Sequence, residues 1–164
     1  LASGGAVSLS HGRIVTILSA GDDSAKSFTV TGTDVNGDAQ TESITGANDG
    51  TATGTSYFLT ISGISAVGNP AGNVSAGVNA SAADVIFAGR ARLRGVGLTS
   101  TGTAGNIDFL NTSPSGTSIM KVSSVGSATS TRDLKIPDEG VLFTSGIYIQ
   151  YTVSTFLTLT AFHA

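Results

Sequence analysis

The sequence predicts an all-β protein made of two small antiparallel β-modules in tandem. Short runs of residues alternate between apolar and polar side chains, and none shows the three-to-four-residue spacing of an amphipathic helix. Clusters of Gly, Asn, Asp and Ser separate these runs at intervals of about 8–12 residues, as is typical of sandwiches and barrels. The 164 residues of the chain suffice for one large sandwich or for two small modules.

The first module is predicted over residues 1–81, and both modules are expected to be β-sandwiches of an immunoglobulin-like or jelly-roll-like kind. Asp34-Val35-Asn36-Gly37-Asp38 predicts a hairpin, because Asn-Gly accepts the positive φ that both central positions of a type I′ turn require. Ile64 departs from the alternation of Leu59 and Ile61, which predicts a β-bulge or bend at Gly63. The expected strands are residues 13–18, 27–33, 41–45, 57–67 and 73–78.

The second module is predicted over residues 82–164 as a β-sandwich. Residues 79–83 carry no bulky core-forming side chain and are interpreted as the junction between the modules. Pro137-Asp138-Glu139-Gly140 predicts a turn, since Pro presets φ and Gly accepts left-handed geometry. The expected strands are residues 85–87, 90–99, 106–111, 118–125, 132–136, 141–143, 146–152 and 156–162.

The composition favours a protein that buries its surface against neighbours. Charged residues make up only 12% of the chain, about half the usual share. The net charge of −3 disfavours binding to nucleic-acid phosphates. The chain has no cysteine, which excludes disulfides and thiolate chemistry. No apolar run is long enough for a membrane span, and residues 1–12 do not resemble a signal peptide.

No pattern of residues in the sequence indicates an active site. The two histidines, His11 and His163, are near opposite ends of the chain, and no nucleophile elbow or phosphate-binding loop occurs. The adjacent acids Asp22-Asp23 and Asp138-Glu139 are interpreted as solvated turn residues and not as a glycosidase pair. We therefore expect no enzyme activity, no catalytic residue, no cofactor and no metal.

One acidic segment superficially resembles the start of a calcium loop. In residues 34–38, however, the Gly stands at the fourth position of the loop instead of the sixth, and Thr45 occupies the place of the closing Glu. The segment is therefore interpreted as a hairpin turn. A weak cation held by Asp22, Asp23 and Asp49 is the remaining alternative.

Arg90, Arg92 and Arg94 are the candidate partner-binding residues. In a regular strand their spacing places all three side chains on one face. The functional interpretation is an anchor for an acidic partner surface, because Arg binds carboxylates in bidentate fashion. The alternative is the solvated face of an edge strand, where charge prevents unwanted pairing.

Two sets of segments consist of turns and strands in a recurrent pattern. In the first half they are residues 21–24, 28–34, 40–46, 50–52 and 71–75, and in the second half they are residues 94–96, 136–143 and 146–149. These segments resemble the β-modules of tailed-phage virion structural proteins, including those of cyanophages. The resemblance covers nearly the whole chain.

The resemblance implies a structural component of a phage particle. It implies a capsid cement or decoration protein, frequently a homotrimer, whose partners are the major capsid protein and copies of itself. Such a protein is made in the host bacterial cytoplasm and resides on the particle surface. A tail, neck or fibre-adaptor protein is the alternative position. A glycan- or receptor-binding module, with Tyr57, Tyr148 and Tyr151 stacking on sugars, is a further alternative, although aromatic residues in strands are more often core residues.

Overall fold

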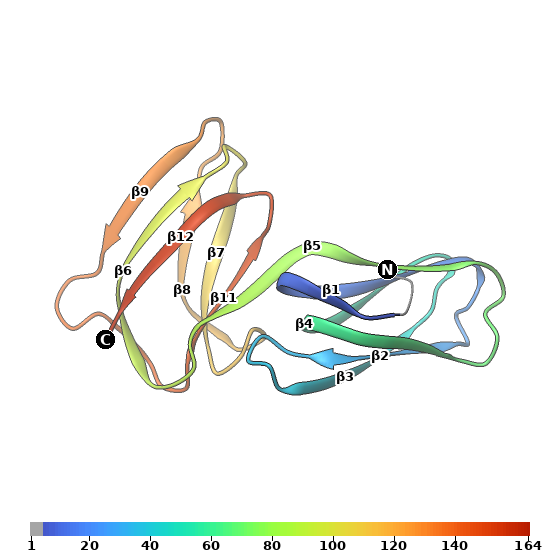
Figure 1. Cartoon of the computed structure of the whole chain (residues 1–164). Coiled ribbons are helices and arrows are strands. Elements are labelled where there is room, and N and C mark those ends of the chain that lie inside the picture. Colours follow the sequence, from blue (N-terminus) through green and yellow to red (C-terminus); the bar gives the residue numbers. More distant parts are fainter. Residues whose placement is uncertain (1–4) are drawn as a thin grey trace. The chain divides into compact units, whose positions relative to one another are not determined.

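The computed structural model describes residues 5–164, and these contain β-strands, turns and bends but no helix. The predicted all-β class is therefore confirmed, with antiparallel pairing throughout the strand pairs described below. The chain divides into two compact units, Leu1–Asn79 and Ala80–Ala164. Each unit is described separately, and Figure 1 gives the strand labels.

The first unit is a curved sheet that folds over its own apolar face. Its strands run in the order β3-β2-β4-β1-β5, and β5 contributes only its first residues to this unit. The strands are β1 (Val7–Asp22), β2 (Ser27–Thr33), β3 (Ala39–Thr45), β4 (Asn48–Val67) and β5 (Val74–Phe87). The enclosed core is formed by Val15, Ile17, Phe28, Val30, Ile44, Phe58 and Ile61.

β1 and β4 are much longer than predicted. The early part of β4 pairs with β1, as in Thr53 opposite Thr16, whereas its last part pairs with β2, as in Ala66 opposite Phe28. β4 therefore pairs with β1 along its early part and with β2 along its last part. Irregularities in the β1–β4 register bend the two strands. β4 includes residues 48–56, where no strand was expected.

The predicted bulge beside Gly63 is confirmed. Thr31 pairs with Gly63 and the next residue, Gly32, pairs with Ile61, so that Ser62 is the extra residue on β4. The backbone approach is closest at Gly32, where an added Cβ would lie 1.9 Å from the carbonyl oxygen of Thr60. Glycine is required at residue 32 because the bulge brings the two backbones together there.

The β2–β3 hairpin is confirmed, but its predicted type I′ turn is wrong. Only Gly37 has positive φ (89°), whereas type I′ also requires it at Asn36. The Gly37 N–H donates to the Asp34 carbonyl at 3.2 Å, and the Asp34 N–H donates to the Asp38 carbonyl at 2.9 Å. The Asp34 carboxylate also accepts the N–H groups of Asn36 and Asp38 at 2.8 and 3.0 Å. These bonds stabilise a three-residue loop with a left-handed glycine.

The predicted junction at residues 79–83 is part of a strand. The expected strands 73–78 and 85–87 are two parts of β5, which runs through the junction without a break. The units divide between Asn79 and Ala80, two residues before the predicted boundary. Ala82 and Ala83 are fully buried and pair with β11, because small residues other than Gly and Pro leave strand hydrogen bonding intact.

The second unit is a two-layer sandwich. One layer has the order β5-β11-β7-β8, and in the other β6 lies between β12 on one side and β9 and β10 on the other. Its strands besides β5 are β6 (Ala91–Ser100), β7 (Gly105–Asn111), β8 (Thr117–Ser124), β9 (Ser130–Lys135), β10 (Val141–Phe143), β11 (Ile147–Thr152) and β12 (Phe156–His163). Leu93 and Leu98 from β6 pack against Phe109 from β7 and Ile147 from β11 in the core.

The turn predicted between β9 and β10 is confirmed. The Gly140 N–H donates to the Pro137 carbonyl at 3.2 Å, and Gly140 has a φ of 77°. Asp138 also has positive φ (56°), an arrangement that Asp tolerates better than most side chains. This turn lies against the middle strand of its layer, β6, and so enters the candidate site.

Candidate partner-binding surface

The three arginines come from one end of β6, but they do not form the regular face that their spacing predicts. Arg90 is in the bend before β6, whereas Arg92 and Arg94 belong to the strand. Arg94 is at an irregularity, because Leu93 pairs with His163 while Gly95 pairs with Phe162. Arg92 and Arg94 flank the buried Leu93 and therefore point away from the core.

The interpretation of this segment as an edge strand is wrong. β6 pairs with β12 on one side and with β9 and β10 on the other. Charges on a middle strand do not serve to block edge pairing, since both backbone edges are already occupied. The arginines therefore do not protect a strand edge. This result does not bear on whether they bind an acidic partner.

The Pro137–Gly140 turn connects Arg92 and Arg94. The guanidinium of Arg92 lies 3.1 Å from the carboxylate of Glu139 and donates to the Gly140 carbonyl at 3.5 Å. An added Cβ at Gly140 would lie 3.3 Å from Cγ of Arg94, so the stem of Arg94 packs beside the same turn. Arg90 and Arg92 in turn share a shallow hollow of about 150 Å³ with Leu142.

We call Arg90, Arg92 and Arg94 the arginine surface. The exposed fraction of the Arg92 side chain is 34%, and that of Glu139 is 78%, so their ion pair is open to solvent. Arg90 and Arg94 are exposed and form no ion pair with another residue of the described range 5–164. Two of the three guanidinium groups are therefore available to a carboxylate-bearing partner.

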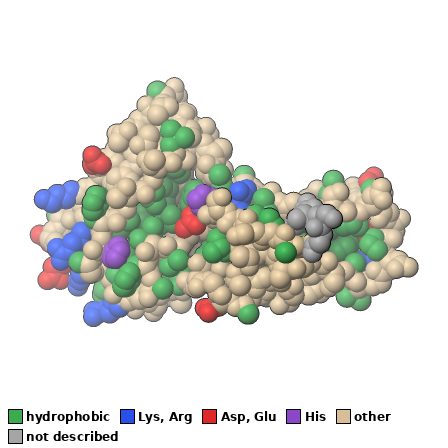
Figure 2. All heavy atoms as spheres, in the orientation of Figure 1, with side chains coloured by type: hydrophobic (Ala, Val, Ile, Leu, Met, Phe, Trp, Pro, Cys, Tyr) green, Lys and Arg blue, Asp and Glu red, His purple; other side chains and the backbone are tan. Residues whose placement is uncertain are grey.

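Neighbouring strands extend the charged region beyond what the sequence suggested. β9 pairs with β6 and places Lys135 opposite Gly95, on the outer face of the layer, whereas Arg132 is opposite the buried Leu98 and belongs to the other face. Figure 2 shows Lys and Arg side chains gathered over this part of the second unit, with Asp and Glu among them. The first unit carries two basic and six acidic residues, and the second carries six basic and five acidic ones. Lys135 and Glu139 were missed as site residues because neither the pairing of β9 with β6 nor the position of the turn that follows β9 leaves a local signal in the sequence.

The interpretation of Asp22 and Asp23 as a solvated pair is half wrong. Asp22 is exposed and accepts the Ser24 hydroxyl at 2.6 Å, and this hydrogen bond, together with that from the Ser24 N–H, lowers the pKa of its carboxyl. Asp23 is fully buried, and its carboxylate accepts the Ala71 N–H at 2.7 Å. Within residues 5–164, no group of three or more His, Cys, Asp or Glu side chains could hold a metal ion, which leaves the alternative cation at Asp22, Asp23 and Asp49 without support.

The three tyrosines divide between the core and a polar hollow. Tyr57 and Tyr148 are buried, so neither presents a ring to a sugar. Tyr151 is half-buried, donates its hydroxyl to Asp84 at 2.8 Å and lines a hollow of about 270 Å³ in the second unit. Polar residues complete the lining: Ser81, Asn106, Asp108, Gln150 and Thr152.

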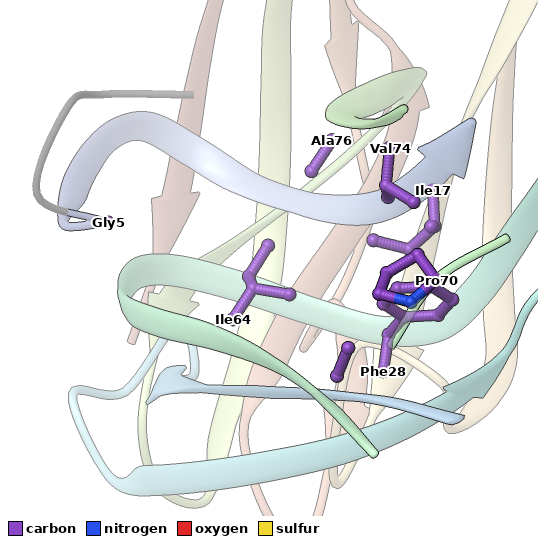
Figure 3. A pocket seen from close by; sticks show the side chains of 8 residues that line it. Gly5, Ile17, Phe28, Ile64, Pro70, Val74 and Ala76 are labelled. Atoms are coloured by element: carbon purple, nitrogen blue, oxygen red, sulfur yellow. The ribbon is translucent and has the colours of Figure 1, made fainter. Parts of the chain in front are cut away.

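The first unit contains an apolar cavity of about 310 Å³. Figure 3 shows the side chains of Ile17, Phe28, Ile64 and Val74 around it, from four different strands, with Pro70 from the β4–β5 loop. No charged or hydrogen-bonding side chain is among its lining residues. The cavity therefore offers no groups for acid–base chemistry.

Comparison of the chain with protein-family models, curated proteins and solved structures found no match. No helix long and apolar enough to cross a membrane occurs within residues 5–164.

Proposed function

We propose that the chain is a non-enzymatic structural protein of a phage particle. In this proposal it is a cement or decoration protein on the surface of the head, where it bridges subunits of the major capsid protein. It is made in the host bacterial cytoplasm and incorporated into the particle. A tail, neck or fibre-adaptor protein remains the alternative position, because the same architecture suits either place.

The arginine surface carries the proposal. Its arginines come from a middle strand of a two-layer sandwich and the bend just before it, so the backbone that presents them is held on both sides. An interaction surface on paired strands is more precise than one on loops, because little side-chain and backbone entropy is lost on binding. Arg90 and Arg94, which lack an ion pair within residues 5–164, suit carboxylates of a protein partner.

The test is incorporation of a triple variant, R90A/R92A/R94A, into particles. We expect its occupancy to fall by at least about tenfold, because losing contacts to desolvated carboxylates costs roughly 2–5 kcal/mol. The variant R90K/R92K/R94K retains the charge but not the bidentate geometry and should recover part of the occupancy. A K26A/K121A variant, which removes two basic residues elsewhere, should incorporate normally. Full occupancy of the triple alanine variant would show that the arginine surface does not bind the partner.

A glycan-binding module is the second candidate function, favoured by the polar hollow beside Tyr151. Amide, hydroxyl and carboxylate side chains line this hollow and match the hydroxyl groups of a sugar, whereas the Tyr151 ring packs against the core of the second unit. Gln150 is directly opposite Asp108 in the β11–β7 pair, so both lie on the same face of the sheet. A glycan array with the wild-type chain and with N106A/Q150A tests this function. Binding that the double variant abolishes would support it, and absence of binding by the wild type would refute it.

A further inference from the structure

β12 has an unpaired edge. On one side it pairs with β6, and on the other it has no strand neighbour within residues 5–164 (Figure 1). A free strand edge presents a row of N–H and C=O groups that can bind the strand of another chain. β12 differs from the other edge strands in how its edge is protected against pairing with another chain.

The other edge strands carry the protection that proteins ordinarily use against such pairing. β3 contains Glu42 and β8 contains Lys121, while β9 contains three charged residues. β10 has no charge but is only three residues long. Charged and short edge strands both resist pairing with other chains.

β12 has neither form of protection. Its eight residues, Phe-Leu-Thr-Leu-Thr-Ala-Phe-His, include no Asp, Glu, Lys, Arg, Gly or Pro. Leu157 and Phe162 are 61% and 59% exposed. A long, uncharged strand with exposed apolar side chains is suited to β-augmentation.

The strand is also complementary to a second copy of itself. Leu159 and Ala161 pair with the buried Leu98 and Val96 and so lie on the inner face of the layer, whereas Thr160 and Phe162 pair with Gly97 and Gly95 on the outer face. An antiparallel partner must place residues of the same face opposite one another. A two-fold axis through Thr160 meets this condition.

In that register the cross-strand pairs nearest the axis are favourable. On the outer face, Phe162 of each copy is opposite Thr158 of the other, an aromatic and β-branched pair. On the inner face, Leu159 is opposite Ala161, which continues the apolar interior from one sandwich into the next. No like charges oppose each other, since the strand has none.

We propose that two copies of this chain associate through antiparallel pairing of their β12 strands, with the two-fold axis at Thr160. The occupant of the free edge is thus a second copy, and the contact is isologous. This two-fold contact is a different association from the trimer that the resemblance implies. It goes beyond the proposed function, since the dimer forms whether or not the chain enters a particle.

The first test is the mass of the purified full chain in solution, measured by sedimentation over a wide concentration range. We expect twice the 16.3 kDa of the single chain at high concentration. T160K places two Lys side chains opposite each other at the axis and should weaken association by at least about tenfold. T117K makes the same change on the edge strand β8 and should associate as the wild type does. A wild-type chain that stays monomeric, or a T160K variant that associates unchanged, would overturn the proposal.

The second test does not depend on how well β12 tolerates a charge. The chain has no cysteine, so in T160C the only available disulfide joins two copies. Residues directly opposite in an antiparallel pair have Cα atoms about 4.5–5.5 Å apart, within the range for a disulfide. We expect T160C to form a covalent dimer under mild oxidation and T117C to remain monomeric. Failure of T160C to cross-link, or equal cross-linking of T117C, would contradict the β12 contact.

Discussion

The carboxylate of Asp23 accepts a hydrogen bond from the backbone N–H of Ala71 at 2.7 Å, although 48 residues separate them in the chain. Asp23 also donates its own N–H to the Ala47 carbonyl at 3.0 Å. One fully buried residue therefore connects the β1–β2, β3–β4 and β4–β5 turns at one end of the first unit. This arrangement explains why an acid occurs where the sequence suggested an exposed turn.

We expect D23A to lower the free energy of unfolding by about 1–3 kcal/mol, because it leaves the Ala71 N–H without its acceptor. D23N retains an acceptor oxygen and should cost less. D38A is the control, since Asp38 is exposed in the β2–β3 turn of the same unit. Chemical denaturation measures all three variants. Equal stability of D23A and D38A would contradict the role assigned to Asp23.

The bulge between β2 and β4 gives a second prediction. G32A should destabilise the protein by at least about 2 kcal/mol, because its Cβ would collide with the Thr60 carbonyl and force the strands apart. G63A is a matched control in the same bulge, where an added Cβ would meet its nearest atom at an ordinary 3.7 Å. Thermal unfolding compares the two variants, and a G32A protein as stable as G63A would show that the backbones do not approach so closely.

The fold class and most strands could be predicted because period-two alternation is a local signal. β2 and β10 have the predicted bounds, and the bulge at Gly63 was evident from the displaced Ile64. The type of the β2–β3 turn could not be predicted, since the Asp34 carboxylate decides it through hydrogen bonds that span the loop. The continuity of β5 was missed because Ala and Ser suit a buried strand as well as a loop.

The sequence predicted the three arginines of the candidate site but not how they are arranged. Arg90, Arg92 and Arg94 stood out because basic residues are scarce in this chain. Their geometry depends on long-range pairing, because β12, β9 and β10 make β6 a middle strand and bring Glu139 to Arg92. Neither the irregularity at Arg94 nor the position of Arg90 outside the strand has a signature in the spacing of the three residues.

The pKa of the Asp22 carboxyl depends on its hydrogen bonds from Ser24. The hydroxyl and N–H of Ser24 stabilise its charged form and hold the pKa of the carboxyl below the ordinary value of 3.8. A lowered pKa in the folded state contributes stability above the unfolded pKa, and that contribution is lost as pH falls through the folded value. S24A should therefore raise the pKa of Asp22 toward 3.8. A carbon-detected NMR titration measures it, and a wild-type pKa at or above that of S24A would contradict the hydrogen bond.

The Arg92–Glu139 ion pair should contribute little to stability. Both side chains are partly or largely exposed, and pairs of this kind are worth about 0–1 kcal/mol. A double-mutant cycle of R92A and E139A measured by denaturation should give a coupling energy within that range, and it should shrink at high salt. A coupling of several kcal/mol would mean that Arg92 is a structural residue, and the loss of incorporation in the triple variant would then have a different cause.

The proposed place of the chain is the head of a phage particle, as a structural part. The most direct measurement is electron microscopy of purified particles, with the chain located by comparing wild-type particles with particles that lack it. We expect density of the chain's size at regular positions on the head and missing from the particles that lack the chain. Density found only on the tail, or particles that contain no copy of the chain, would contradict this placement.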